Sequence, residues 1–201
     1  MLGIIDYNMG NLASVFNACS KFTNNVKIVK DATQIKDLSK LILPGVGAYK
    51  DAMEHLNQNN LKDEILNFAQ SGKPLLGICL GMQLLFESSQ EFGHTKGLNL
   101  IDGEVVKFDK SKMNEDLKIP HMGWNILKTK DNPLFKGLVN PYLYFVHSFH
   151  AVTDEKNVIA TTNYGYEFVS AVNKDNIFGF QPHPEKSHNN GLKILENFIN
   201  M

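Results

Sequence analysis

The sequence contains no long apolar run. None of its stretches approaches the roughly 20 apolar residues that a membrane-spanning helix needs. Residues 1–6 have no charged lead before a brief apolar run, so they do not fit the pattern of a secretion signal. We therefore expect a soluble, cytoplasmic protein with no membrane partner.

Cysteine is scarce, and an excess of charge of either sign is missing. Cys19 and Cys79 are the only two cysteines, too few for a disulfide framework, and a reducing compartment disfavours their pairing. Basic residues number 20 and acidic residues 21, and no dense block of Lys or Arg could follow a chain of phosphates. We expect no disulfide and no nucleic-acid partner.

Metal-ligand spacing is also missing. The seven histidines form no His-Glu-x-x-His pattern, and the cysteines form no Cys-x-x-Cys pair. We expect no metal and no other cofactor. His147 and His150 are interpreted as substrate-facing or structural.

The chain length and the order of its patterns predict one α/β domain over residues 1–201. A chain of 201 residues with 43% hydrophobic residues can fill one core, and it shows no internal repeat or linker. Buried strands alternate with amphipathic helices, which favours a mostly parallel sheet covered on both faces. The expected strands are 2–5, 26–29, 40–43 and 75–78, and the expected helices are 12–19, 32–38, from about 48, 61–69 and from 79 through about 86.

The second half of the chain has a different pattern. Short β-like runs recur between polar turns, which predicts a more antiparallel region. Residues 107–118 mix both charges and are expected to form a solvated loop, and apolar residues at helical spacing predict a final helix over 192–199. The expected strands are 105–108, 125–128, 142–146, 158–162, 168–173 and 177–180.

Cys79 is the strongest candidate for a reactive group. It follows a buried strand, Gly77 and Gly81 flank it, and helical periodicity resumes directly after it. This pattern is typical of a nucleophile elbow, in which a strained turn exposes the thiol above a sheet and a helix N-terminus favours the thiolate. The alternative is a buried cysteine that serves as a small apolar residue, which is our interpretation of Cys19.

His183 and Glu185 are the candidate base and its orienting carboxylate. Pro182 and Pro184 favour an extended backbone, in which residues two apart project from the same face. A cysteine nucleophile needs such a base and a group that orients it. A surface histidine beside a solvated glutamate is the alternative.

An oxyanion hole would complete the site. On elbow folds it takes the N–H of the residue after the nucleophile, here Leu80, and one N–H from a loop after an earlier strand. The loop Pro44-Gly45-Val46-Gly47 has that position, and its glycines allow backbone N–H groups to approach closely. A plain turn is the alternative.

These residues together resemble the class I glutamine amidotransferases. The nucleophile motif Gly-x-Cys-x-Gly-x-Gln is present at residues 77–83, and His-Pro-Glu is present at 183–185. More specifically, the segments 5–12, 44–47, 120–125 and 144–148 are similar to those of glutaminase subunits of imidazole glycerol phosphate synthases. The resemblance covers nearly the whole chain and implies a flavodoxin-like α/β fold.

The resemblance implies glutamine hydrolysis without a cofactor. Cys79 would attack the side-chain amide to form a thioester, His183 would transfer the proton to ammonia, and Glu185 would orient His183. Gly45, Val46 and Gly47 would form the adjustable side of the oxyanion hole. The residues implied to hold glutamine are Gln83, Tyr144, Phe145, Val146, His147 and Ser148.

The resemblance also implies a partner. Subunits of this kind dock as heterodimers on a (β/α)₈-barrel cyclase of histidine biosynthesis, which receives the ammonia through an internal channel. Asn11, Trp124 and Lys186 are the implied interface residues.

Three positions depart from the family pattern and leave alternatives open. Asn8 stands where glycine is usual, Phe149 where tyrosine is common, and Pro182 where an aromatic residue usually precedes His-Pro-Glu. One alternative is a paralogue that supplies ammonia for amidination of a surface-glycan sugar. The others are a non-catalytic docking subunit and a cysteine hydrolase or redox protein on a similar fold.

Overall fold

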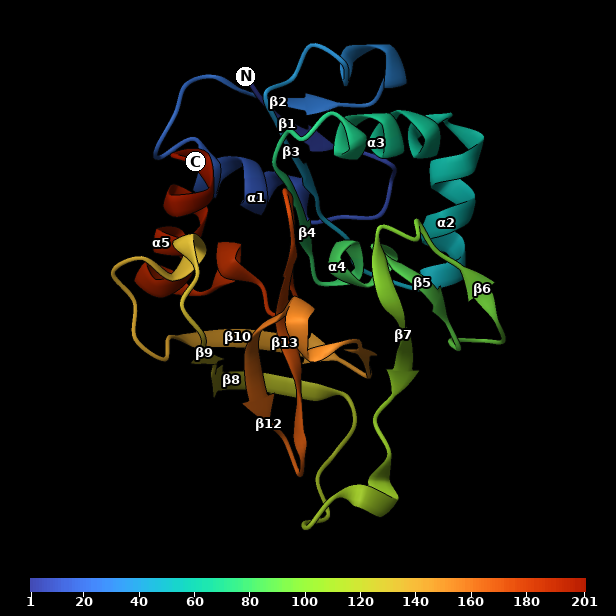
Figure 1. The fold of residues 1–201 in the computed structure, drawn as a ribbon, viewed down its shortest axis with the longest axis vertical. Helices are drawn as coiled ribbons and strands as arrows, with labels where there is room; N and C mark the ends of the chain where they lie inside the picture. Colours follow the sequence, from blue (N-terminus) through green and yellow to red (C-terminus); the bar gives the residue numbers. More distant parts are fainter.

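A 12-stranded mixed sheet runs through the computed structural model, which describes all 201 residues (Figure 1). Its main path is β2-β1-β3-β4-β14-β13-β11-β7-β5-β6; off this path β12 pairs with β13, and β9 pairs with β12. The first five strands of this path are mutually parallel, as expected. They are β2 (Val26–Val29), β1 (Leu2–Ile5), β3 (Lys40–Leu43), β4 (Leu75–Ile78) and β14 (Ile177–Phe180).

Helices cover both faces of the parallel part. The side chains of successive strand residues point to opposite faces of the sheet. Ile4 therefore packs in one hydrophobic cluster and Ile5 in the other. The helices α1 and α5 lie on one side, and α2 and α3 lie on the other (Figure 1). Their bounds are α1 Leu12–Cys19, α2 Tyr49–Gln58, α3 Leu61–Gln70 and α5 His188–Ile199. None of the helices is long and apolar enough to cross a membrane.

The antiparallel second half is also present, with more strands than the sequence indicated. β8 and β10 form a separate two-stranded ribbon in which His121 is opposite His147. The remaining strands are β5 Phe86–Ser89, β6 Thr95–Lys96, β7 Ile101–Lys107, β8 His121–Ile126, β9 Lys128–Thr129, β10 Tyr142–His147, β11 Phe149–Val152, β12 Val158–Asn163 and β13 Glu167–Lys174.

Several expected boundaries were wrong. The helix after Cys79 is only α4 (Leu80–Leu84), because the buried Phe86 begins β5, which pairs with β7. The strand expected at 125–128 starts at His121 and is interrupted after Ile126. The helix expected at 32–38 is a single 3₁₀ turn, Ala32–Gln34, and the strands β5, β6 and β11 were not anticipated.

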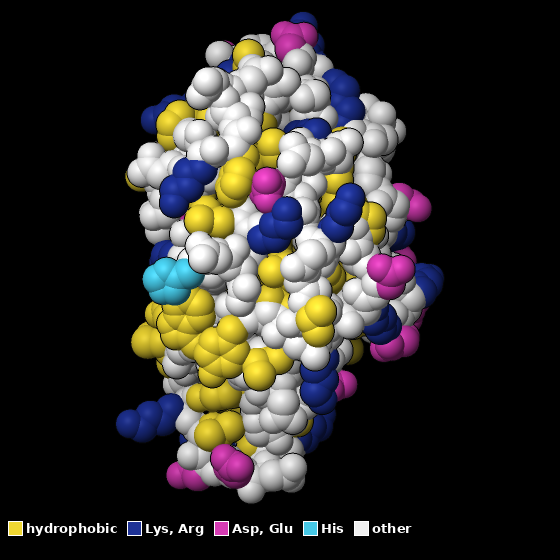
Figure 2. All heavy atoms as spheres, turned by 90° about the vertical axis from the view of Figure 1, so that its left-hand side faces the viewer, with side chains coloured by type: hydrophobic (Ala, Val, Ile, Leu, Met, Phe, Trp, Pro, Cys, Tyr) yellow, Lys and Arg dark blue, Asp and Glu magenta, His cyan; other side chains and the backbone are white.

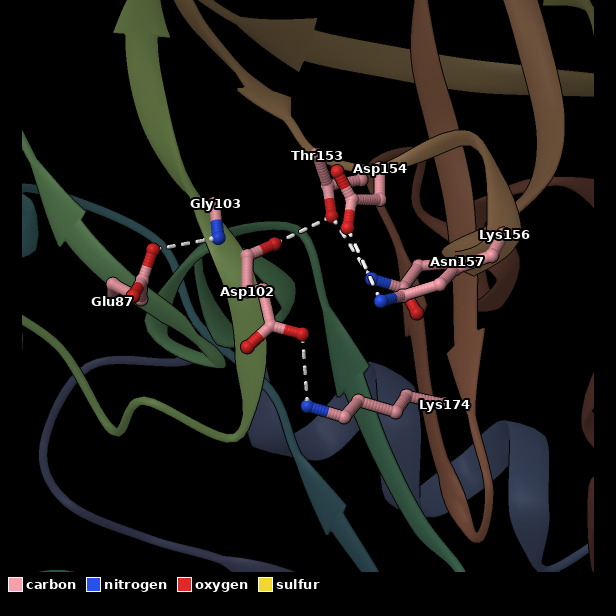
Figure 3. Close-up of polar contacts among 8 residues, drawn as sticks. All are labelled: Glu87, Asp102, Gly103, Thr153, Asp154, Lys156, Asn157 and Lys174. Atoms are coloured by element: carbon pink, nitrogen blue, oxygen red, sulfur yellow. Dashed lines mark hydrogen bonds and ion pairs between the residues drawn. The ribbon is translucent and has the colours of Figure 1, made fainter.

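A polar cluster joins the strands of the antiparallel half (Figure 3). Lys174 Nζ at the end of β13 lies 3.1 Å from Asp102 Oδ2 on β7, and the hydroxyl of Thr153 donates to the Asp102 carbonyl oxygen. The Gly103 N–H donates to Glu87 Oε2 at 2.9 Å, which joins β7 to β5. The Lys174–Asp102 pair is solvent-exposed and therefore adds little stability.

Candidate active site

Cys79 occupies a strained turn between β4 and α4. Its φ of 53° and ψ of −111° are unfavourable for a residue with a side chain, and its N–H donates to the Phe180 carbonyl oxygen at 2.7 Å. A Cβ at Gly77 would lie 2.6 Å from the Gly81 carbonyl oxygen, and one at Gly81 would collide with the carbonyl oxygen of Leu43. The turn therefore requires both glycines. Because α4 has only five residues, its dipole gives the thiolate less support than the sequence suggested.

His183 and Glu185 form a buried pair. His183 Nδ1 lies 2.8 Å from Glu185 Oε1, and the two side chains are 2% and 1% exposed. The expectation of an extended segment is confirmed at His183, with φ −101° and ψ 93°, but was wrong after it, because Pro184–Lys186 is a 3₁₀ turn. This turn places the Glu185 carboxylate beside the ring. The carboxylate orients the imidazole and leaves its Nε2, which makes no hydrogen bond, as the reactive nitrogen.

The surroundings of His183 raise its pKa and favour the charged imidazole at neutral pH. Burial disfavours the charge, but interaction with the Cys79 sulfur and with Glu185 outweighs it and raises the pKa of His183 to about 10. The site therefore holds the proton that a departing amine or ammonia needs.

A cavity of about 240 Å³ opens beside the thiol. Tyr144 and Phe145 do not line it: the Phe145 ring is fully buried in the core, and Tyr144 acts through its backbone, whose carbonyl oxygen accepts the His183 N–H at 2.8 Å. Gly45 also lies outside the lining and packs against Gly81. The lining residues are Val46, Gly47, Cys79, Leu80, Gln83, Glu91, Val146, His147, Ser148, Phe149 and His183.

In the loop at residues 44–47, the Val46 N–H points to the loop that contains Met9. The Val46 N–H donates to the Met9 carbonyl oxygen at 3.2 Å, and the Tyr7 hydroxyl donates to the Pro44 carbonyl oxygen at 2.7 Å. Leu80 is the first residue of α4, so its N–H has no acceptor within the helix. In this conformation Leu80 offers an oxyanion donor and Val46 does not.

Two residues of the site were missed by the sequence analysis. Gln181 Nε2 lies 3.8 Å from Cys79 Sγ, and Gln181 Oε1 accepts the amide of Gln83 at 3.0 Å. Its position directly after a strand, two residues before His183, was the available signal. Glu91 lies in the loop after β5, and since that strand was not recognised, nothing in the pattern placed Glu91 near the thiol.

The polar groups of the cavity can accept hydrogen bonds from an ammonium group and from an amide. Glu91 is its only carboxylate and can receive an ammonium group, and Gln83 offers Oε1 because its Nε2 already donates to Phe149 and Gln181. The sequence has no arginine, and no lysine lines the cavity. No group of three or more His, Cys, Asp or Glu side chains could hold a metal ion.

One expected interface residue, Trp124, lies on an apolar face of the β8–β10 ribbon. Trp124 is 38% exposed and stacks on His188 and Tyr142, with ring centroids 5.0 and 6.3 Å apart. Figure 2 shows hydrophobic side chains gathered beside a histidine on this side of the molecule. Lys186 is exposed at the triad turn, and Asn11 precedes α1. We define the docking face as Met122, Trp124, Ile126 and Tyr142, all of which are exposed.

Comparison with known proteins identifies the family. The family model described as glutamine amidotransferase class-I matches residues 3–201. The chain belongs to that family. The imidazole glycerol phosphate synthase subunit HisH of Sulfurimonas denitrificans is 63% identical over 200 residues, which cover 98% of this chain and 97% of the relative. The protein of the same name from Wolinella succinogenes is 58% identical and covers 98% of each chain.

Solved structures agree on the fold. A glutamine amidotransferase crystal structure aligns with a TM-score of 0.76 at 18% identity over 98% of each chain. Thermotoga maritima PurLQS aligns with the same score at 22% identity, over 99% of this chain and 97% of that one. The flavodoxin-like fold with an antiparallel second half is confirmed.

The charge of His183 can be tested directly. In the intact protein its imidazole should not titrate between pH 6 and 8, and Cys79→Ala should lower its pKa because the sulfur that stabilises the charge is gone. The bound proton stabilises the fold fully below pH 6.5, and this contribution is lost as pH rises towards about 10. Histidine NMR titration measures the pKa. Cys19→Ala is the matched control, and an unchanged pKa in Cys79→Ala would contradict the assignment.

Proposed function

We propose that the chain is the glutaminase subunit of an imidazole glycerol phosphate synthase. The observation that carries the proposal is the placement of Cys79 and His183 on one cavity of about 240 Å³, with Glu185 bonded to His183 behind it. Full-length relatives at 58–63% identity carry the same subunit name. The subunit would hydrolyse glutamine and deliver ammonia to a (β/α)₈-barrel cyclase of histidine biosynthesis.

The geometry supports a thioester mechanism. The Cys79 sulfur attacks the side-chain carbonyl carbon of glutamine, and the negative charge moves to the carbonyl oxygen beside the Leu80 N–H. His183 Nε2 gives its proton to the departing nitrogen, so the C–N bond breaks and ammonia leaves. The neutral imidazole then takes a proton from water, which attacks the thioester and releases glutamate, while Glu185 keeps the ring oriented.

The loop at residues 44–47 is the proposed point of control. In the chain alone the Val46 N–H is bonded to Met9, so the oxyanion would meet one donor instead of two. Gly45 and Gly47 allow the intervening peptides to rotate, and Gly47 already has a φ of 103°. We propose that binding of the barrel partner turns this N–H toward the substrate.

We propose that the partner binds at the docking face and that Asn11 and Lys186 also contact it. Stacked aromatic side chains that remain exposed are the typical anchors of a protein interface. Delivery through a channel suits the chemistry, because ammonia released to water is mostly protonated and no longer nucleophilic. Both cysteines are free thiols, which fits the cytoplasmic location that we propose. No observation favours the glycan-modifying paralogue.

Cys79→Ala tests the role of the thiol. Glutamine-dependent synthesis by the complex should fall by at least about 10³, because no thioester can form. Synthesis from added ammonium salts should stay within about twofold of the wild type, because the barrel partner uses ammonia from any source. His183→Ala should have the same effect on both activities, and Glu185→Gln should lose less of the glutamine-dependent activity. Cys19→Ala is the control, and loss of both activities in Cys79→Ala would mean that Cys79 is structural.

Trp124→Ala tests the docking face. Removing a central aromatic anchor should weaken partner binding by about 2 kcal/mol, or roughly 30-fold in Kd. Titration calorimetry with the purified barrel subunit measures the change. Ile28→Ala removes an exposed apolar side chain from the edge strand β2 and should leave Kd unchanged. A loss below about threefold for Trp124→Ala would place the interface elsewhere.

Steady-state glutaminase assays test the control by the loop. The isolated subunit should be a poor glutaminase, and the barrel partner loaded with acceptor should raise turnover by about 10²–10³, the usual effect of one oxyanion donor. Stimulation below about tenfold corresponds to less than about 1.4 kcal/mol of barrier and would be too small for a missing donor.

A further inference from the structure

Two buried histidines face each other in the β8–β10 ribbon. His121 Nδ1 lies 3.0 Å from His147 Nε2, and the residues are 2% and 6% exposed. They are opposite each other in the strand register. His147 also lines the cavity beside Cys79, so the pair connects the inside of the ribbon to the substrate site.

The hydrogen bonds determine which nitrogens carry protons. His147 Nδ1 lies 2.7 Å from the Phe149 carbonyl oxygen, and since a carbonyl only accepts, Nδ1 carries the hydrogen. A neutral His147 then presents a lone pair at Nε2, so His121 Nδ1 must be the donor. His121 Nε2 is left as an acceptor, and the amide nitrogen of Asn125 lies 3.4 Å from it.

The surroundings keep both rings neutral. Burial lowers the pKa of His121 to about 4 and holds the pKa of His147 well below its usual range. The ionisable groups that face His147 include His121, His150 and His183, each of which disfavours a positive charge on it. Tyr164 stacks on His121 with ring centroids 4.0 Å apart. At neutral pH, His121 therefore donates to His147, and His147 donates to the Phe149 carbonyl oxygen.

The Phe149 carbonyl links this pair to the nucleophile. It accepts the Nδ1–H of His147 and also an N–H of Gln83 Nε2 at 3.2 Å. The other N–H of Gln83 Nε2 goes to Gln181 Oε1, and Gln181 Nε2 reaches Cys79 Sγ. One run of hydrogen bonds thus extends from β8 to the thiol.

We propose that His121 and His147 act as one positioning unit that holds the segment from His147 to Phe149 in the orientation needed for glutamine binding. The inference rests on the proposed glutaminase function and deepens it. His147 lines the binding cavity, and His121 acts through His147 without reaching the substrate. If the His121 donor is lost, His147 is free to turn and the carbonyl of Phe149 loses a fixed partner.

Two substitutions at His121 separate positioning from packing. His121→Leu keeps an apolar filling but removes the donor, whereas the amide nitrogen of His121→Asn can take the place of Nδ1–H. His150→Leu is the matched control. Both His121 and His150 pack on the ring of Phe108. The two ring nitrogens of His150 are hydrogen-bonded to the Ala151 carbonyl oxygen and the Tyr166 hydroxyl, and His150 does not line the cavity.

The assay is glutamine hydrolysis by the complex with the barrel partner. His121→Leu should raise KM for glutamine about tenfold, or 1.4 kcal/mol, with kcat changed less than about twofold. His121→Asn should return KM to within about threefold of wild type, and His150→Leu should leave it unchanged. Ammonium-dependent synthesis should be unchanged in all three variants. A wild-type KM in His121→Leu, no rescue by His121→Asn, or an equal rise in His150→Leu would overturn the inference.

A spectroscopic measurement covers the case in which His121→Leu does not fold. Long-range proton–nitrogen NMR spectra of the wild-type chain at pH 7 should show His121 and His147 neutral, with the proton on Nδ1 in both. A charged ring, or a proton on Nε2 of either, would overturn the inference. A wild-type complex that does not hydrolyse glutamine would instead reject the proposed function, so the two failures are distinguishable.

Discussion

The parallel pairing of β14 with β4 is the constraint on which the site depends. Gly179 pairs with Gly77 and Phe180 with Ile78, so the two strands end together. Cys79 follows one strand and residues 181–183 follow the other, which brings the thiol next to groups about a hundred residues away in the chain. The Cys79 N–H bond to the Phe180 carbonyl oxygen fixes this junction. An antiparallel β14 would leave His183 at the opposite edge of the sheet.

The absence of side chains at Gly77 and Gly179 is as important as the strand pairing. α4 crosses directly over the paired glycines: a Cβ at Gly179 would lie 2.7 Å from Met82 Cγ, and one at Gly77 would meet the Gly81 backbone. The short helix can therefore start immediately after Cys79, and the strain at Cys79 is maintained by the surrounding core. Asn8, which stands where glycine is usual in the family, adopts a φ of 67° in the loop next to the site, and asparagine tolerates this left-handed backbone better than most residues.

The sequence predicted those parts of the fold that have a local signal. Buried strands such as Leu2–Ile5 and Ile177–Phe180 were found with exact bounds, because continuous apolar runs bounded by polar turns mark them. β5 was missed because Phe86 continues the apolar run of α4, and only pairing with β7 separates the two elements. Glu91 was missed for the same reason. The approach of Gln181 to the thiol and the bond from Val46 to Met9 depend on tertiary placement, which no spacing along the chain encodes.

The β8–β10 ribbon connects the docking face to the catalytic groups in two ways. Its outer side carries Trp124 and Tyr142, and its inner side carries His121 and His147. Its backbone also meets the triad turn: the Tyr144 carbonyl oxygen accepts the His183 N–H at 2.8 Å, and the Tyr144 N–H donates to Ser187 Oγ at 2.9 Å. The proposed docking face therefore belongs to the same ribbon whose strand β10 contacts the base and lines the cavity. The ribbon is a separate two-stranded sheet, whereas Cys79 is held at the junction of β4 and β14 in the main sheet.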